Sequence, residues 1–552
     1  MKKTDVLVIL FIILASFYSL NDLFIPGYFT SHDGPHQIVR AYYYQDLIKE
    51  GQFPPRYVFG LNYGFGYPLF IFSYHMPWLI SEIFNQLGLS IIDSVKMTFL
   101  FGFIFSGILM YFYQKMLFGR PSAFIGALIY LFSPFRFSNI FVRSAIGDAT
   151  ALIFAPLIFW LFDLIRKSKG INISYIIFLA LSLSALLLSH AMIFFFFVFS
   201  LFLYGIYRLI LDKNKFNLIK STVLSLIFFV FFSSFYLLPS FIERSYTKFK
   251  DTMGPLKTVI NFLPIPKLIY SPWGYGTVDA EFGPMSLSIG PVSLFIGTAV
   301  FLSLVFAIVR KKNILKSNFS YGLIFFLIFA LTIIMMLPSS LYFWKVLSRY
   351  VIIDFNWRIL NLTTFTVSIL AGWLFFQLKA KRKLASFLGL TLLILAFYTN
   401  RNHLRINQTL DWSVPFFLKL EKTTNSFDEY SPKWSDPHYV KENAPKIAVS
   451  DRFTYEFITQ KNSLYELKVK VTRSDKLNLN VLYYPGWAAY VNGKKVKIEF
   501  EEKGLIEIPF EPGDYHLLVK FEKTPLRKTA DFLTLISIII AGGYLLKEKI
   551  YG

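Results

Sequence analysis

Two acidic residues with basic neighbours carry the strongest chemical signals in the sequence. Asp33 lies between His32 and His36, and Asp148 follows Arg143 by five positions. A carboxylate can remove the proton of an attacking hydroxyl group, and a nearby imidazole can share that proton or help to hold a divalent cation. Asp33 also precedes Gly-Pro at the start of an amphipathic run, so capping of a helix N-terminus is the alternative interpretation.

Both acids are expected at the outer boundary of hydrophobic segments. Charges at a membrane boundary are costly and usually face a bundle interior or a water-filled space. A functional role is therefore favoured, in which Asp33 and Asp148 could face one cavity and together bind Mg²⁺ or Mn²⁺. The alternative for Asp148 is an ion pair with Arg143 that caps the following span.

His32, His36 and Arg143, beside the two acids, are candidates for substrate binding, and three further residues join them. His190 stands alone between two apolar runs, where it is either a ligand-binding group or a residue that satisfies a helix end. Arg358 closes the stretch 354–358 and could hold a phosphate with a bidentate fork, or reach toward lipid headgroups. Trp273 lies in an aromatic turn that could stack on a sugar or lie in the membrane interface.

The composition identifies the kind of protein that must position these residues. Of 552 residues, 55% are hydrophobic and only 16% are charged, whereas soluble domains are typically about 25% charged. The chain is therefore an integral membrane protein. The absence of Cys excludes disulfides, thiolate zinc sites and Cys nucleophiles, and motifs for nucleotide hydrolysis, zincins and serine hydrolases are missing.

Hydrophobic runs of about 20 residues predict twelve membrane spans in a mainly α-helical bundle. They lie near residues 5–24, 92–117, 121–141, 144–165, 171–189, 191–211, 219–240, 287–309, 319–338, 358–378, 384–400 and 529–546. Only Ser189-His190 separates the fifth from the sixth, so a merged or re-entrant element is an alternative there.

The distribution of positive charge predicts the orientation. The net charge is +22, and residues 401–526 carry 19 basic and 17 acidic residues, so the membrane part holds nearly all of it. The positive charge therefore lies in the loops between hydrophobic segments, and it does not indicate a nucleic-acid partner. Lys and Arg gather in alternate loops, Lys379 to Lys383 among them, so the positive-inside rule puts both termini in the cytoplasm of a plasma-membrane protein. Four long segments are then outside: 25–91, 241–286, 339–357 and 401–526.

The last outer segment has a different pattern. Apolar residues alternate with polar ones over 465–471 and 477–482, which is typical of half-buried strands. Turns at Pro485-Gly486, Asn492-Gly493, Lys503-Gly504 and Pro512-Gly513 indicate a small antiparallel sandwich. The predicted organisation is a bundle over 1–400, an extracytoplasmic β-rich domain over 401–526, and a last span with a cytoplasmic tail over 527–552.

Several of these stretches resemble a known family. They are Asp33-x-x-His36, Ile48 to Arg56, Asn62 to Phe70, Ser189-His190, Asn356-Trp357-Arg358 and Tyr483 to Lys494. They are similar to the polytopic membrane proteins called 6-pyruvoyl-tetrahydropterin-synthase-related, which resemble the YfhO-like group of the GT-C glycosyltransferase superfamily. The scattered histidines do not support pterin chemistry.

The resemblance implies a GT-C-like bundle and a transferase that takes a sugar from a polyprenyl-phosphate donor. The acceptor would be an extracytoplasmic glycan, lipid or protein. The resemblance assigns the catalytic acid of the first outer loop to Asp33 and a second acid, more loosely, to Asp148. The alternatives are a lipid or glycolipid transporter and a catalytically idle scaffold.

Overall fold

The computed structural model describes residues 2–212, 214–253, 261–278, 283–315, 319–349 and 355–551. Asp354 and parts of the predicted outer loops 241–286 and 339–357 lie outside them. The chain forms two compact units. Unit 1 comprises residues 1–38, 74–229 and 257–413, and unit 2 comprises residues 39–73, 230–256 and 414–552.

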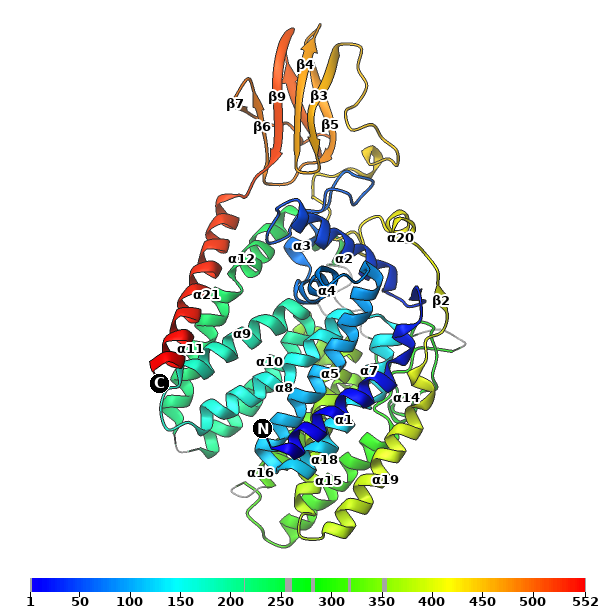
Figure 1. Ribbon diagram of the computed structural model, residues 1–552, viewed down its shortest axis with the longest axis vertical. Coiled ribbons are helices and arrows are strands. Elements are labelled where there is room, and N and C mark those ends of the chain that lie inside the picture. Colours follow the sequence, from blue (N-terminus) through cyan, green and yellow to red (C-terminus); the bar gives the residue numbers. More distant parts are fainter. Residues whose placement is uncertain are drawn as a thin grey trace. The chain divides into compact units, whose positions relative to one another are not determined.

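Unit 1 is a bundle of apolar helices (Figure 1). Its longer helices are α1 (Lys3–Ser19), α4 (Met76–Gln86), α5 (Ile91–Phe118), α6 (Arg120–Leu131), α8 (Ile146–Lys167), α9 (Ile173–Ser189), α10 (Ala191–Leu211), α15 (Pro291–Val309), α16 (Phe319–Met336), α18 (Leu360–Gln377) and α19 (Arg382–Asn400). Within it α8 packs against α5 and α9, while α18 packs against α6 and α16. Helices α2 (Gly34–Lys49) and α11 (Lys215–Phe232) run across the boundaries between the units.

Nine helices of the described residues are long and apolar enough to cross a membrane. This confirms a multi-pass helical membrane protein. Three of the twelve predicted spans differ from simple long helices. The regions 5–24 and 171–189 form the 17-residue helices α1 and α9, and region 121–141 is bent by 47° between α6 and the next helical segment. Twelve crossings remain a prediction that requires all three to span.

The bend in region 121–141 has a local cause. Helix α6 ends at Leu131, and α7 (Pro134–Phe137) begins with a proline, which has no N–H to continue the hydrogen bonding of the preceding turn. Segment η2 (Ser138–Val142) then widens into a π-helical turn. Such turns are rare and often occur at functional sites. The next residues along the chain are Arg143 and Ser144.

Short elements complete unit 1. Strands β1 (Tyr28–Phe29) and β2 (Thr409–Leu410) pair antiparallel. The remaining short helices are η1 (Asn21–Phe24), α14 (Ile265–Ile269), η4 (Pro338–Ser340), α17 (Leu341–Leu347), η5 (Asn356–Ile359) and η6 (Arg401–Leu404). Segment η5 leads directly into α18, so Arg358 stands at the start of a buried helix.

Unit 2 contains the predicted antiparallel β-domain (Figure 1). Five strands pair in the order β3-β4-β9-β6-β7, and β5 pairs with β8. The strands are β3 (Phe453–Lys461), β4 (Leu464–Val471), β5 (Asp475–Leu482), β6 (Trp487–Val491), β7 (Lys494–Val496), β8 (Leu505–Phe510) and β9 (Gly513–Phe521). The two strands predicted from alternation are confirmed as β4 and β5. Asn492 and Gly493, both with positive φ, form the predicted two-residue turn between β6 and β7.

The rest of unit 2 is helical. It contains α3 (Leu69–Phe72), α12 (Ser234–Ile242), η3 (Glu243–Tyr246), α13 (Phe249–Met253), α20 (Val414–Leu420), η7 (Pro437–Tyr439) and α21 (Pro525–Tyr551). Helix α21 runs beside α12. Two ion pairs formed by buried arginines join distant parts of this unit: Arg56 with the half-buried Asp531, and Arg527 with the buried Glu243.

Candidate functional site

The loop that carries Asp33 is joined to the loop that carries Arg143. The backbone N–H of His32 donates to the carbonyl of Val142 at 2.9 Å, and that of Asp33 donates to the carbonyl of Arg143 at 3.0 Å. Two segments more than 100 residues apart in sequence therefore run side by side within unit 1.

Ser144 fixes this junction. Its φ of 53° lies in the left-handed region, which is uncommon for a residue other than glycine. Its carbonyl accepts from the buried Gln37 amide at 3.0 Å, and its hydroxyl is within hydrogen-bond distance of Ser31 and of Tyr28. The strained turn is thus held from both sides by the segment around Asp33.

Asp33 itself is half-buried and stands before the first turn of α2. Its carbonyl accepts from the N–H of Gln37 at 3.0 Å, so its backbone occupies the helix-capping position. Among the described residues, however, no hydrogen bond or ion pair engages its carboxylate. The capping interpretation therefore accounts for the backbone of Asp33 and leaves its side chain available.

Asp148, at the first turn of α8, differs from Asp33 because both of its carboxylate oxygens accept hydrogen bonds. Its side chain is 1% exposed. One oxygen accepts from Arg143 and from the Asn361 amide, each at 3.0 Å, and the other accepts from Arg358 at 3.0 Å. The predicted Arg143–Asp148 ion pair is present, but it belongs to a larger cluster.

The buried side of the cluster is held together by hydrogen bonds among its own residues. Arg143 also donates to Asn139, whose amide donates to Asn361 at 2.9 Å. The guanidinium of Arg143 lies 4.7 Å from the centre of the Trp357 ring, a cation–π contact. Burial, followed by the charge of Arg358, lowers the pKa of Arg143, while the negative charges of Asp148 and Asp33 act in the opposite direction.

Arg358 and His190 form the accessible side of the cluster. Their side chains are 11% and 17% exposed, compared with 4% for Arg143. One guanidinium nitrogen of Arg358 lies 3.0 Å from Nε2 of His190, and that nitrogen of His190 lies 3.6 Å from Asp148. Arg358 therefore faces this cluster and does not extend into lipid.

The position of His190 results from close packing at the start of two helices. Its Nδ1 accepts from the N–H of Met192, so it caps α10 as well as contacting Arg358. Its ring stacks on Tyr74 at 5.8 Å. A Cβ on Gly147 would lie 3.1 Å from the imidazole and 2.7 Å from the carbonyl of Ser189, so only glycine fits there. The helix-end interpretation of His190 is confirmed by its cap of α10, and a ligand-binding role stays a prediction.

The remaining predicted residues lie around the Asp33 loop. His32 is exposed, and its Nε2 is 3.2 Å from the carbonyl of Tyr275. His36 is half-buried on the first turn of α2. Trp273 packs edge-on against His403 at 4.4 Å. The aromatic turn therefore adjoins His32, and the recorded ring contacts of Trp273 are with His403 and Tyr275 and not with the Asp148 cluster.

The predicted metal site does not fit this geometry. Both oxygens of Asp148 accept hydrogen bonds from Arg143, Arg358 and Asn361. A cation would have to displace these donors and approach two guanidinium groups. In the part of the chain that the structure describes, no three His, Asp or Glu side chains gather in a group able to hold a metal ion.

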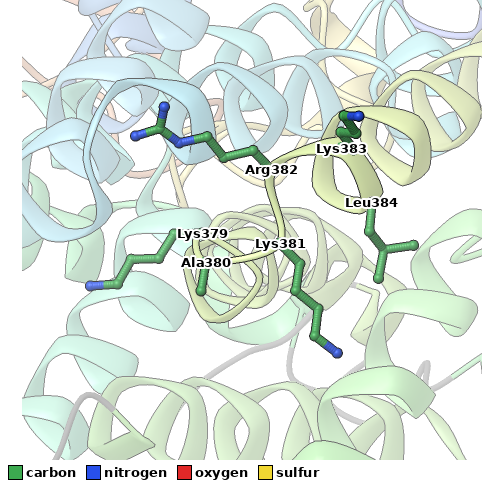
Figure 2. A pocket seen from close by; sticks show the side chains of 6 residues that line it. All are labelled: Lys379, Ala380, Lys381, Arg382, Lys383 and Leu384. Carbon is green, nitrogen blue, oxygen red and sulfur yellow. The ribbon is translucent and has the colours of Figure 1, made fainter.

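An open depression at the loop between α18 and α19 is a separate feature. It is lined by Lys379, Ala380, Lys381, Arg382, Lys383 and Leu384. Figure 2 shows that the four basic side chains diverge from one another. A specific binding site needs converging polar groups, so this surface is a solvated basic loop, at one of the segments predicted to be cytoplasmic.

Sequence reasoning missed several members of the cluster. Asn139 and Asn361 are each 1% exposed and connect Arg143 to Asp148, and Tyr74 supports His190. Asn361 follows Arg358 by three positions, so it lies on the same side of the helix start and could have been found by helical spacing. Asn139 gave no comparable signal, because its placement depends on the π-helical turn.

Comparisons with known proteins identify similar structures but no family. No protein-family model matches the chain, and no curated protein matches it in sequence. Similar solved structures include the arabinofuranosyltransferase AftD from Mycobacteria, at TM-score 0.48 and 10% identity, covering 74% of this chain and 27% of AftD. The archaeal oligosaccharyltransferase AglB from Archaeoglobus fulgidus, with a bound dolichol-phosphate, matches at TM-score 0.45 and 14% identity, covering 73% and 55%.

ArnT from Cupriavidus metallidurans, bound to undecaprenyl phosphate, is also similar, at TM-score 0.30 and 12% identity, covering 75% of this chain and 84% of ArnT. The chain spans about a quarter of the length of AftD and about half that of AglB. At these similarities the function has to be argued from the site.

Proposed function

We propose that this protein is a membrane glycosyltransferase that moves a sugar from a polyprenyl-phosphate donor to a hydroxyl group of an extracytoplasmic glycan, lipid or protein. The observation that carries the proposal is the presence, in one unit, of an unengaged carboxylate, Asp33, and a partly exposed guanidinium, Arg358, with the imidazole of His190 beside it. A base and an anion-binding group are the two functions that such a transfer needs.

Asp33 acts as the catalytic base. Its carboxylate is half-buried and has no partner among the described residues, so it can accept a hydrogen bond from an acceptor hydroxyl. Its loop is fixed by backbone bonds to Val142 and Arg143. A base held at a fixed position can contribute about 10²–10⁴-fold to the rate.

Arg358 and His190 bind the phosphate of the donor. A guanidinium group suits phosphate oxygens because of its fixed donor geometry, and the site keeps water away from much of the pair. Asp148 does not act on the substrate in this proposal. It orients Arg358 and Arg143 through its buried oxygens and is a positioning residue, which differs from the catalytic role that the sequence predicted.

The proposed reaction is a single displacement at the anomeric carbon. The acceptor oxygen forms a bond to the anomeric carbon while the bond from that carbon to the phosphate oxygen breaks. The proton of the hydroxyl passes to Asp33, and the polyprenyl phosphate leaves with the electron pair, stabilised by Arg358. Attack opposite the leaving group inverts the anomeric configuration. No step passes through a metal ion.

His32, His36 and Trp273 bind the sugar or the acceptor in this proposal. All three lie on or beside segments that adjoin Asp33: the first two flank it, and Tyr275 connects the aromatic turn to His32. The proposed topology has both termini in the cytoplasm and the β-domain outside, and the proposed subgroup is the YfhO-like, 6-pyruvoyl-tetrahydropterin-synthase-related type.

The test is donor consumption by purified protein in lipid nanodiscs. A panel of polyprenyl-phosphate-linked hexoses and pentoses is supplied, with water as the surrogate acceptor, and release of polyprenyl phosphate is followed. We expect release from at least one donor, its loss in Asp33→Asn, and its retention in the exposed control Asp411→Asn. Release that is equal in Asp33→Asn and the control would refute the catalytic role.

The two alternatives give different results in the same preparation. A lipid or glycolipid transporter would move a labelled lipid between leaflets without cleaving it, and Asp33→Asn would change that movement. An idle scaffold would neither cleave nor move the lipid. Either result would replace the transferase proposal.

A further inference from the structure

Two short helices of unit 1 expose apolar side chains that a water-facing surface would not carry. In α14 and the residue after it, Ile265, Ile269 and Tyr270 are 57%, 47% and 69% exposed. In α17, Tyr342 is 80% exposed, and Leu341, Phe343 and Val346 are also exposed. We call these seven residues the α14–α17 surface. Several large apolar side chains exposed on one short helix mark a surface that contacts a membrane or another protein.

Both helices are fixed to the same end of α16, which is one of the helices able to span a membrane. The N–H of Leu263 donates to the carbonyl of Met336, the last residue of α16, at 3.0 Å. The indole of Trp344 in α17 donates to the carbonyl of Met335 at 2.8 Å. The exposed residues are therefore held where a membrane span ends.

Each helix has one buried side chain that anchors it and several that face outward. Leu268 is 2% exposed, and its carbonyl accepts from the N–H of Ile289. Trp344 is also 2% exposed and fills the equivalent role in α17. With so few side chains packed against the protein, the outward residues need another apolar environment.

Basic residues accompany the apolar ones. Lys267 lies in α14, Lys345 lies in α17, and Arg349 follows it; all three are exposed. Apolar side chains interspersed with Lys and Arg are typical of helices that lie in the membrane interface, where the cations meet lipid phosphates. Tyr270 and Tyr342 suit the same region, because their rings are apolar and their hydroxyls are polar.

We propose that α14 and α17 are interfacial anchors that insert the α14–α17 surface among the lipids beside the end of α16. The occupant is the bilayer, because both helices are attached to the end of a span and carry cations suited to lipid headgroups. Helix α16 also contacts η5, the segment that carries Arg358, and Thr332, four residues before this end of α16, accepts from the hydroxyl of Thr363 at the start of α18 at 3.0 Å. The anchors would thus hold the membrane surface next to the candidate site, although the membrane contact itself does not depend on the proposed function.

The absence of Cys from the chain allows a direct test. Single variants Tyr342→Cys and Ile265→Cys are labelled with an environment-sensitive fluorophore and placed in nanodiscs with and without brominated lipids. Ile540→Cys, on the span α21, is the membrane control. Val449→Cys is the aqueous control, because Val449 is 89% exposed and apolar but lies in a polar segment before the β-strands.

We expect blue-shifted emission at residues 342 and 265 and quenching by lipids brominated near the headgroup, with little quenching by aqueous iodide. Emission and iodide quenching equal to those at residue 449 would overturn the proposal. So would protection from both quenchers, which would indicate a second copy or a partner protein on this surface. Membrane contact at only one of the two positions would overturn the pairing of the helices.

Discussion

Replacing Asp148 with Asn should destabilise the protein strongly, whereas replacing Asp33 with Asn should not. Asp148 is 1% exposed and accepts three hydrogen bonds of 3.0 Å, two of them from guanidinium groups. An Asn side chain of the same shape would remove the negative charge and turn one oxygen into an NH₂ group that faces donors. Arg143, only 4% exposed, would keep its charge without the carboxylate that it hydrogen-bonds.

The expected size follows from the burial of this pair. Removing one partner of a buried ion pair costs about 3–5 kcal/mol. A substitution that breaks no contact usually changes the free energy of unfolding by about 0.5 kcal/mol or less, which is the expectation for Asp33→Asn. Adding Arg143→Gln to Asp148→Asn removes the orphaned charge and should recover part of the loss, with a coupling energy of about 0.5–3 kcal/mol.

The assay is thermal denaturation in detergent, followed by the fluorescence of the nine Trp residues. The predicted order of midpoints is Asp33→Asn close to the unmodified protein, then the double variant, then Asp148→Asn. A stable Asp148→Asn would refute the argument that Asp148 orients two cations. A double variant no more stable than the single one would refute the assignment of the cost to Arg143.

Three further predictions concern other parts of the fold. Gly147→Ala should displace the His190 ring and the Ser189 carbonyl, since a Cβ would lie 3.1 Å from the ring and 2.7 Å from that backbone oxygen, and it should lower both lipid-phosphate binding and thermal stability. Equal affinity in the two proteins would contradict this. Arg527→Met should lower the free energy of unfolding by about 3–5 kcal/mol, because it leaves Glu243 buried without its cation. Adding Glu243→Leu should restore much of the melting temperature. A double variant with no higher melting temperature would contradict this explanation. Burial lowers the pKa of Lys446 to about 8 from 10.5. Between these two pH values the unfolded chain binds more protons than the folded one, so the free energy of unfolding should rise with pH. Lys446→Met should remove this rise, which is measured as melting temperature against pH.

The sequence predicts the fold class well because long apolar runs and strict alternation are strong local signals. The break at Ser189-His190 is confirmed by the end of α9 and the start of α10, and the turn at Asn492-Gly493 is confirmed between β6 and β7. The bend between α6 and α7 was not predicted, because an apolar run of 21 residues with one internal Pro, Pro134, allows either a straight or a broken helix.

The candidate site could be predicted from the sequence only in part. The candidate acids and cations were named from their neighbours, but their division of labour depends on burial. Asp33 and Asp148 look alike in sequence, and only the hydrogen bonds from Arg143, Arg358 and Asn361 show that one is engaged and the other is not. Contacts between residues more than 200 positions apart leave no local pattern to detect.

The most direct test of the account is the affinity of the protein for undecaprenyl phosphate, the lipid carrier without a sugar, measured in nanodiscs. A charged hydrogen bond to phosphate contributes about 1.5–3 kcal/mol, so Arg358→Gln should bind about 10-fold to 100-fold more weakly. Asp33→Asn and the exposed control Arg401→Gln should bind as the unmodified protein does. Equal affinity in Arg358→Gln and Arg401→Gln would contradict the claim that Arg358 binds the donor phosphate.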